Sequence, residues 1–170
     1  MMNSNLSTKQ RINDLLHVDF KLESYPEFWT FLILWNLFEC RLFDTSFSVS
    51  KALAKNLIVP EGVLKEAMEY FKTRYVEDGK TNGKFDKLNF RQDKSGKDID
   101  KKSHVMNVLL GTKDDELTDS AAILCIVYRL RNNLFHGLKS VESFPNQEVT
   151  FKVVNNFLLS CLENNSSTEM

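Results

Sequence analysis

The chain has 170 residues, a formal net charge of −1 and a globular composition, with 42% hydrophobic and 26% charged residues. This length suits one domain with its own core and is short for two, so we predict a single domain over residues 1–170. The small net charge excludes attraction of nucleic acid by the chain as a whole, and any contact with RNA must come from a local basic patch.

The three cysteines, Cys40, Cys125 and Cys161, lie far apart in apolar stretches. Their odd number and spacing favour reduced, mostly buried thiols over disulfides, and no Cys/His cluster suggests zinc. The longest apolar stretch, 28–37, is interrupted by polar residues and is too short to span a bilayer. The first residues lack the apolar core of a signal peptide. We therefore expect a cytoplasmic protein with no cofactor, no metal and no membrane partner.

The apolar residues recur at helical spacing through most of the chain, which predicts an all-α fold. Pro26 and Pro60 suit the first turns of two of these helices. The helix that begins at Pro26 is apolar almost all round and is expected to be the most buried. A β-prone run near 149–154 leaves a strand there as an alternative. The expected helices cover about 7–21, 26–38, 46–58, 60–75, 103–110, 117–135 and 149–162.

The segment 76–102 differs in composition from the rest of the chain. It holds eight Lys or Arg residues, six Asp or Glu residues and three glycines, with few residues typical of a core. Such a composition predicts a mobile loop or insertion within the domain. A loop of this length is usually functional or disordered, and its slight basic excess could contact RNA or a partner. A solvated loop is the simpler interpretation.

Five polar residues crowd the last turns of the helix predicted over 117–135 and the residue beyond it: Arg129, Arg131, Asn132, Asn133 and His136. Arg131 can bind a phosphate through its planar fork, and His136 can exchange a proton near neutral pH. Asn132 and His136 share a helix face, whereas Arg131 and His136 lie about 140° apart around an ideal helix. The alternative is that Arg131 and His136 only complement the helix dipole at its C-terminus, before Gly137.

The stretch 128–138, Tyr-Arg-Leu-Arg-Asn-Asn-Leu-Phe-His-Gly-Leu, resembles the signature of the HEPN superfamily, which is Arg, a polar residue, a few variable residues and His. In the early apolar helix, Trp35-Asn36-Leu37-Phe38-Glu39 resembles the family's acidic position that faces the motif helix. The resemblance implies a HEPN-like helical bundle that acts as a homodimer, with the two motifs facing each other across the interface.

The resemblance also implies a metal-independent endoribonuclease. His136 would act on the 2′-OH or the leaving oxygen of RNA, Arg131 would stabilise the phosphorane, and Asn132 would position the attacked group. The products would be a 2′,3′-cyclic phosphate and a 5′-hydroxyl. Arg129, Asn133, Glu39 and Asn36 would bind substrate or support the site.

A prokaryotic toxin–antitoxin or phage-defence system is the expected setting, with an antitoxin or another defence protein as a possible partner. Family toxins that a nucleotidyltransferase antitoxin modifies usually carry Tyr two residues after the His, where this chain has Leu138. That form of neutralisation is therefore in doubt. The alternative function is a non-catalytic HEPN module that binds RNA or protein.

Overall fold

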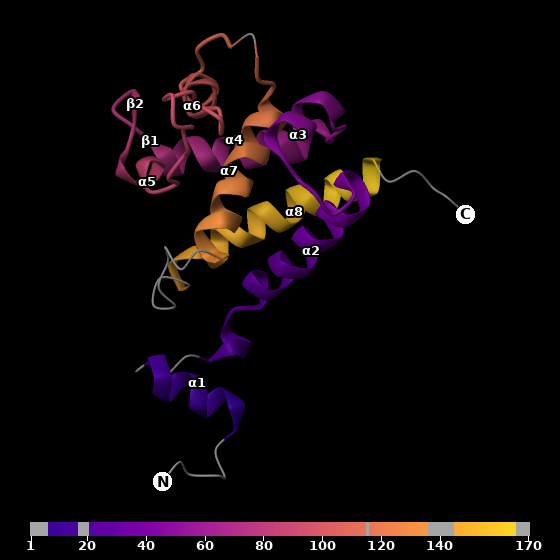
Figure 1. Ribbon diagram of the computed structural model, residues 1–170, viewed down its shortest axis with the longest axis vertical. Helices are drawn as coiled ribbons and strands as arrows, with labels where there is room; N and C mark the ends of the chain where they lie inside the picture. The colour runs from indigo at the N-terminus through magenta and orange to yellow at the C-terminus, as the bar shows by residue number, and fades with distance from the viewer. Residues whose placement is uncertain (1–6, 17–20, 115, 136–144, 166–170) are drawn as a thin grey trace, which may run out of the picture.

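A computed structural model describes residues 7–16, 21–114, 116–135 and 145–165. The predicted all-α fold is confirmed, because helices make up most of the described chain (Figure 1). The strands in the described residues are one pair of two residues each. The long helices are α2 (Pro26–Phe43), α4 (Glu61–Tyr75), α7 (Asp119–Phe135) and α8 (Glu148–Asn165). The shorter elements are α1 (Thr8–Leu16), η1 (Leu22–Ser24), α3 (Val49–Lys55), β1 (Val76–Glu77), β2 (Lys80–Thr81), α5 (Gly83–Asp86), α6 (Lys102–Leu109) and η3 (Pro145–Gln147).

Proline placement explains where two of the long helices begin. Pro26 occupies the first turn of α2, and Pro60 directly precedes α4. Proline is tolerated there because the first N–H groups of a helix have no partner within the helix. At its other end, α2 stops where Asp44 adopts a left-handed conformation with φ of 49°.

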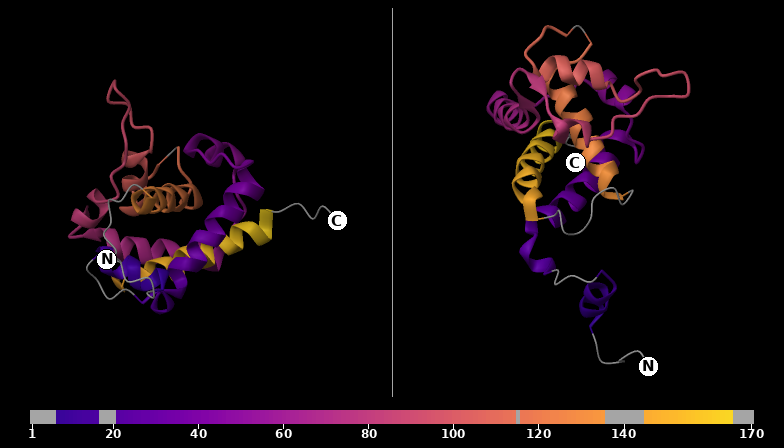
Figure 2. Two further views of the ribbon diagram at one scale, coloured as in Figure 1. Left: turned by 60° about the horizontal axis from the view of Figure 1, so that its bottom comes forward. Right: turned by 90° about the vertical axis from the view of Figure 1, so that its left-hand side faces the viewer.

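The helices α2 and α8 lie side by side along much of their length (Figures 1 and 2). Phe151 of α8 packs between two rings of α2, with ring centroids 5.6 Å from Phe28 and 5.2 Å from Phe31. The Glu148 carboxylate accepts hydrogen bonds from the backbone N–H groups of Glu27 and Phe28, which satisfies two donors at the start of α2. The alternative strand near residues 149–154 does not form. These residues belong to α8, and the helix buries their apolar side chains against α2.

The helix α7 runs through the middle of the molecule and contacts α3, α4 and α6 (Figure 1). Its residues from Ala121 to Val127 are all buried. A helix that is buried on all sides has little freedom to rotate or slide in its surroundings. The polar residues at the end of α7 are therefore carried on a fixed support.

The charged segment 76–102 has more structure than its composition predicted. The strands β1 and β2 pair antiparallel, with Val76 opposite Thr81, and α5 follows directly. Phe85 is 0% exposed and Leu88 is 2% exposed, so both belong to the core. Two well-placed apolar side chains are enough to dock a segment that is otherwise charged. Its mobility in solution stays a prediction.

Two of the three cysteines have the predicted environment. Cys125 and Cys161 are buried, and burial raises the pKa of each thiol to about 12. The prediction was wrong for Cys40, which is exposed on α2 because the apolar residues around it face outward as well as inward. Within the described ranges, no helix is both long and apolar enough to cross a membrane.

Candidate functional site

The site predicted from the sequence lies at the C-terminal end of α7. Arg131 is partly exposed there, whereas Arg129, Asn132 and Asn133 are buried. The described part of α7 ends at Phe135. His136, together with Gly137 and Leu138, lies outside the described residues.

The Arg131 side chain is held by its own helix and by α2. Its Nη1 donates a 3.0 Å hydrogen bond to Asn132 Oδ1, and its guanidinium carbon lies 5.9 Å from the centroid of the Trp35 ring. Trp35 is buried, and its ring stacks on that of Tyr128 with centroids 6.2 Å apart. A guanidinium over an aromatic face gains from the cation–π interaction and keeps its planar fork oriented. The structure thus brings together Arg131, Asn132 and the predicted α2 segment.

Glu39 holds the Trp35 side chain through a hydrogen bond from its indole N–H. Its carboxylate accepts hydrogen bonds of 3.2 Å from Trp35 Nε1 and 3.1 Å from the Phe47 N–H. Glu39 therefore fixes the Trp35 ring and the chain that leads into α3. Asn36, in contrast, is exposed on α2, and none of the described contacts joins it to α7.

Arg129 and Asn133 face the charged segment and lie one helical turn apart. Arg129 Nε donates to the Leu88 carbonyl at 3.0 Å, and Asn133 Nδ2 donates to the carbonyls of Lys87 and Leu88 at 3.0 and 3.2 Å. Together they satisfy the buried Leu88 carbonyl, which accepts from both side chains. These two side chains tie α7 to the segment after α5.

A buried carboxylate, Asp100, completes this tie. Arg129 Nη1 lies 3.2 Å from Asp100 Oδ2, and Arg91 donates to both carboxylate oxygens at 3.0 and 2.9 Å. The hydrogen bonds to Asp100 raise the pKa of Arg91. Burial lowers the pKa of Arg129, and the charge of Asp100 partly offsets this effect. The sequence analysis did not identify Arg91 and Asp100. They lie far from α7 along the chain, so no short sequence motif links them to Arg129.

A separate polar cluster lies between α6 and the start of α7. His104 Nδ1 is 2.9 Å from Asp114 Oδ2, and His104 Nε2 is 3.3 Å from Glu116 Oε2. Burial raises the pKa of Asp114, but hydrogen bonds from the Leu117 N–H, His104, the Glu116 N–H and Asn107 outweigh it and hold the pKa below its usual value. The His104 side chain is 28% exposed. In the part of the chain that the structure describes, no group of His, Cys, Asp and Glu side chains is suited to hold a metal ion.

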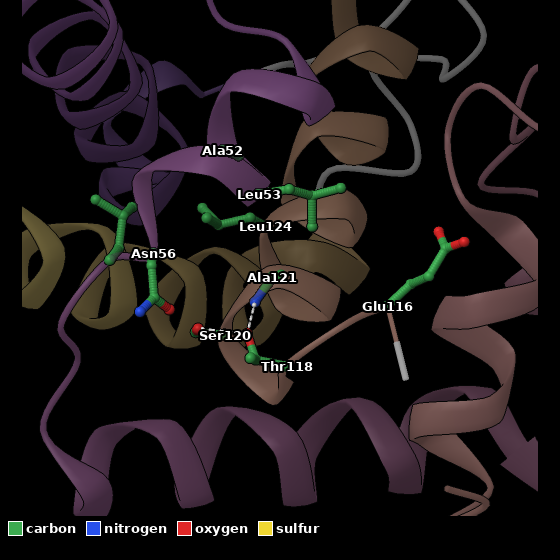
Figure 3. A pocket seen from close by; sticks show the side chains of 9 residues that line it. Ala52, Leu53, Asn56, Glu116, Thr118, Ser120, Ala121 and Leu124 are labelled. Carbon is green, nitrogen blue, oxygen red and sulfur yellow. Dashed lines mark hydrogen bonds between the residues drawn. The ribbon is translucent and has the colours of Figure 1, made fainter. Parts of the chain in front are cut away.

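A small cavity of about 50 Å³ lies at the opposite end of α7 (Figure 3). Asn56 directly after α3, Thr118 directly before α7, and Ser120 and Leu124 of α7 line it, and the Glu116 side chain points away from the others. Such a volume holds water and is well below that of a ligand pocket. From Ala121 to Arg131 the helix axis rises about 15 Å, so this cavity is separate from the motif.

Comparison with known proteins found no match to this chain among family models, curated proteins or solved structures. The fold and the site together define an all-α protein in which a core helix presents an Arg–Asn pair against a buried tryptophan. Any assignment of function therefore rests on the chemistry of these residues.

Proposed function

We propose that this protein is a metal-independent endoribonuclease of a prokaryotic toxin–antitoxin or phage-defence system. The observation that carries the proposal is the fixed position of the Arg131 guanidinium, which bonds to Asn132 at 3.0 Å and lies over the Trp35 ring. A preorganised cation on a rigid helix is suited to stabilise charge that develops on a phosphate. The HEPN-like motif supplies the rest of the reaction.

In the proposed reaction the RNA 2′-oxygen attacks the adjacent phosphorus and displaces the 5′-oxygen. His136 takes part in proton transfer, either from the 2′-OH or to the leaving oxygen. Arg131 stabilises the charge on the phosphorane oxygens. The bond from Arg131 to Asn132 supports a role for Asn132 in orienting the cation. The 2′-O–P bond forms as the P–O5′ bond breaks, which leaves a 2′,3′-cyclic phosphate and a 5′-hydroxyl without any metal or cofactor.

We propose that the active form is a homodimer. Arg131 and His136 lie about 140° apart around an ideal helix, so a second copy can place His136 of one subunit beside Arg131 of the other. An apolar stripe on α2 offers a surface for self-association, because Trp29, Ile33 and Leu37 follow each other at intervals of four residues and are all exposed. The stripe lies on the side of α2 away from Trp35, so it does not itself bring the two motifs together. Exposed apolar patches of this kind are typical of protein interfaces.

The first experiment is cleavage of mixed tRNA and mRNA by the purified protein in EDTA. The parent is expected to release fragments with 2′,3′-cyclic phosphate ends. His136→Ala and Arg131→Ala are expected to lose at least about 100-fold in rate, as the loss of a general acid–base or a charge-stabilising group does. Arg41→Ala removes an exposed arginine of α2 and should cleave like the parent.

Thermal unfolding of all four proteins shows whether lost cleavage reflects lost chemistry. If the folded dimer leaves a broad RNA panel intact, the nuclease proposal fails and the non-catalytic module that binds RNA or protein takes its place. In that case the same substitutions would change binding, because Arg131 and Trp35 would present a cationic and aromatic surface without a reaction.

A further inference from the structure

A second arginine besides Arg131 contacts the stacked rings of Trp35 and Tyr128. The guanidinium carbon of Arg91 lies 5.6 Å from the centroid of the Tyr128 ring, and Arg91 Nη2 is 3.5 Å from the Tyr128 hydroxyl. Arg131 lies against the Trp35 ring of the same pair. Two cations from distant parts of the chain thus flank one aromatic pair at the motif end of α7.

The charges around Arg91 do not cancel. Asp100 accepts hydrogen bonds from Arg91 and lies 3.2 Å from the buried Arg129, so one carboxylate serves two guanidinium groups. This trio keeps one positive charge. The Asp100 and Arg129 side chains are 2% and 4% exposed, whereas the Arg91 side chain is 49% exposed. The surplus charge is therefore presented to solvent through Arg91.

The geometry of Arg91 leaves donors for a further anion. Nε and Nη2 are directed to Asp100, and the Arg91 N–H also donates to Asp100 Oδ2 at 2.7 Å. Among the described residues, no acceptor is hydrogen-bonded to Nη1. A guanidinium that is fixed on one edge by a buried carboxylate and open on the other is preorganised to bind phosphate.

We infer that Arg91 is a second phosphate-binding residue of the site, which holds a backbone phosphate of RNA next to the one that is cleaved. The inference rests on the proposed function, because it names a further contact to the same substrate. Arg91 and Arg131 lie against different rings of the pair, and we assign them to neighbouring phosphates of one strand. Arg91 consequently contributes to binding and register, and Arg131 to the chemical step.

The test compares Arg91→Gln with the parent. Binding is measured by fluorescence anisotropy with a 2′-O-methyl RNA, which lacks the attacking hydroxyl and stays intact. Loss of one phosphate contact should weaken binding on the order of tenfold, and the slope of log K against log salt should become less steep by about 0.7. With cleavable RNA, KM should rise while the single-turnover rate at saturating RNA stays at the parent's value.

Lys94→Gln is the matched control, because it removes an exposed positive charge from the same segment without touching the ring pair. Its binding and salt slope should stay close to those of the parent. Arg91→Lys keeps the charge but loses the planar fork, and intermediate binding is expected. Far-UV circular dichroism and thermal unfolding show whether each variant is folded.

A second measurement identifies the phosphate that Arg91 contacts. Each phosphate of a short RNA is replaced in turn by a neutral methylphosphonate, and one flanking position should weaken binding of the parent but not of Arg91→Gln. Parent-like binding by Arg91→Gln, or a fall in the saturating rate as large as that of Arg131→Ala, would overturn the inference while cleavage by the parent stands. A parent that neither binds nor cleaves RNA would instead refute the proposed function.

Discussion

Arg129 and Arg131 are two residues apart on α7, yet they have opposite environments. Residues two positions apart in a helix are rotated by about 200° around its axis, so the two side chains point to nearly opposite sides of α7. Arg129 is buried against Leu88 and Asp100, whereas Arg131 lies over Trp35 and is partly exposed. The same residue type therefore ties the fold together at one position and presents a cation at the other.

The buried Arg129–Asp100 pair predicts a large loss of stability for Asp100→Asn, a substitution that keeps the size and shape of the side chain. In Asp100→Asn the Arg129 guanidinium stays buried without its counter-charge, because both side chains are almost fully enclosed. Removal of one partner of a buried pair costs about 3–5 kcal/mol in the free energy of unfolding. Urea denaturation followed by circular dichroism measures this loss.

Asp86→Asn provides the comparison at the same scale. Asp86 pairs with Lys102 at 3.3 Å, but both side chains are well exposed, so little change is expected. Equal stability of Asp100→Asn and the parent would show that Arg129 does not depend on Asp100.

At the scale of elements, α5 is the short helix that docks the charged segment on the core. Phe85 lies between Tyr75 of α4 and Phe90, with ring centroids 6.1 and 5.2 Å away. Its backbone is held by Asn82, whose side chain accepts hydrogen bonds from the Lys84 and Phe85 N–H groups. This anchor favours a segment that moves together with the core.

We therefore expect Phe85→Ala to destabilise the whole protein by about 3–5 kcal/mol, as truncation of a fully buried aromatic side chain usually does. Ile99→Ala in the same segment should have a small effect, since Ile99 is 41% exposed. The midpoint and slope of urea unfolding measure both. A near-neutral Phe85→Ala would mean that the segment moves independently of the core, as its composition suggested.

The sequence predicted elements well where the signal is local. Helical spacing and the two prolines located α2, α4 and α7, because amphipathic repeats and helix starts depend on neighbours within a few residues. The same approach missed the docking of Phe85, since a lone aromatic residue among charges has no periodic pattern. It also could not distinguish a strand from a helix at the start of α8, where packing against α2 stabilises the helix.

The candidate site shows the same division. Arg131 and Asn132 were predicted from the motif and Glu39 from the matching early helix, whereas Trp35, which contacts both Arg131 and Glu39, was not among the predicted site residues. Arg91 and Asp100 could not be found, because they approach α7 only through tertiary packing. Asn36 was predicted from its neighbours in sequence, but it lies on the exposed side of α2.

At the scale of the whole molecule, the exposed stripe of α2 predicts how the chain assembles. Ile33 is 63% exposed at the middle of the stripe, so Ile33→Glu should leave the fold intact but bury a charge in the proposed interface. We expect the dimer to dissociate at least about tenfold more readily. Sedimentation velocity over a range of concentrations measures the change.

Ile58→Glu is the matched control, because Ile58 is 66% exposed but lies between α3 and α4, away from the stripe. It should leave the oligomeric state unchanged. If Ile33→Glu sediments like the parent, the stripe is not the interface.

The two tryptophans of the chain lie six residues apart on α2 and give the protein a built-in optical probe. Trp29 is 39% exposed on the stripe, whereas Trp35 is 3% exposed between Arg131 and Tyr128. Their emission should separate into a red-shifted component that acrylamide quenches and a blue-shifted component that it does not. Self-association would shield the first indole, and occupation of the arginine pair would perturb the second, so one fluorescence spectrum can follow both events without a label.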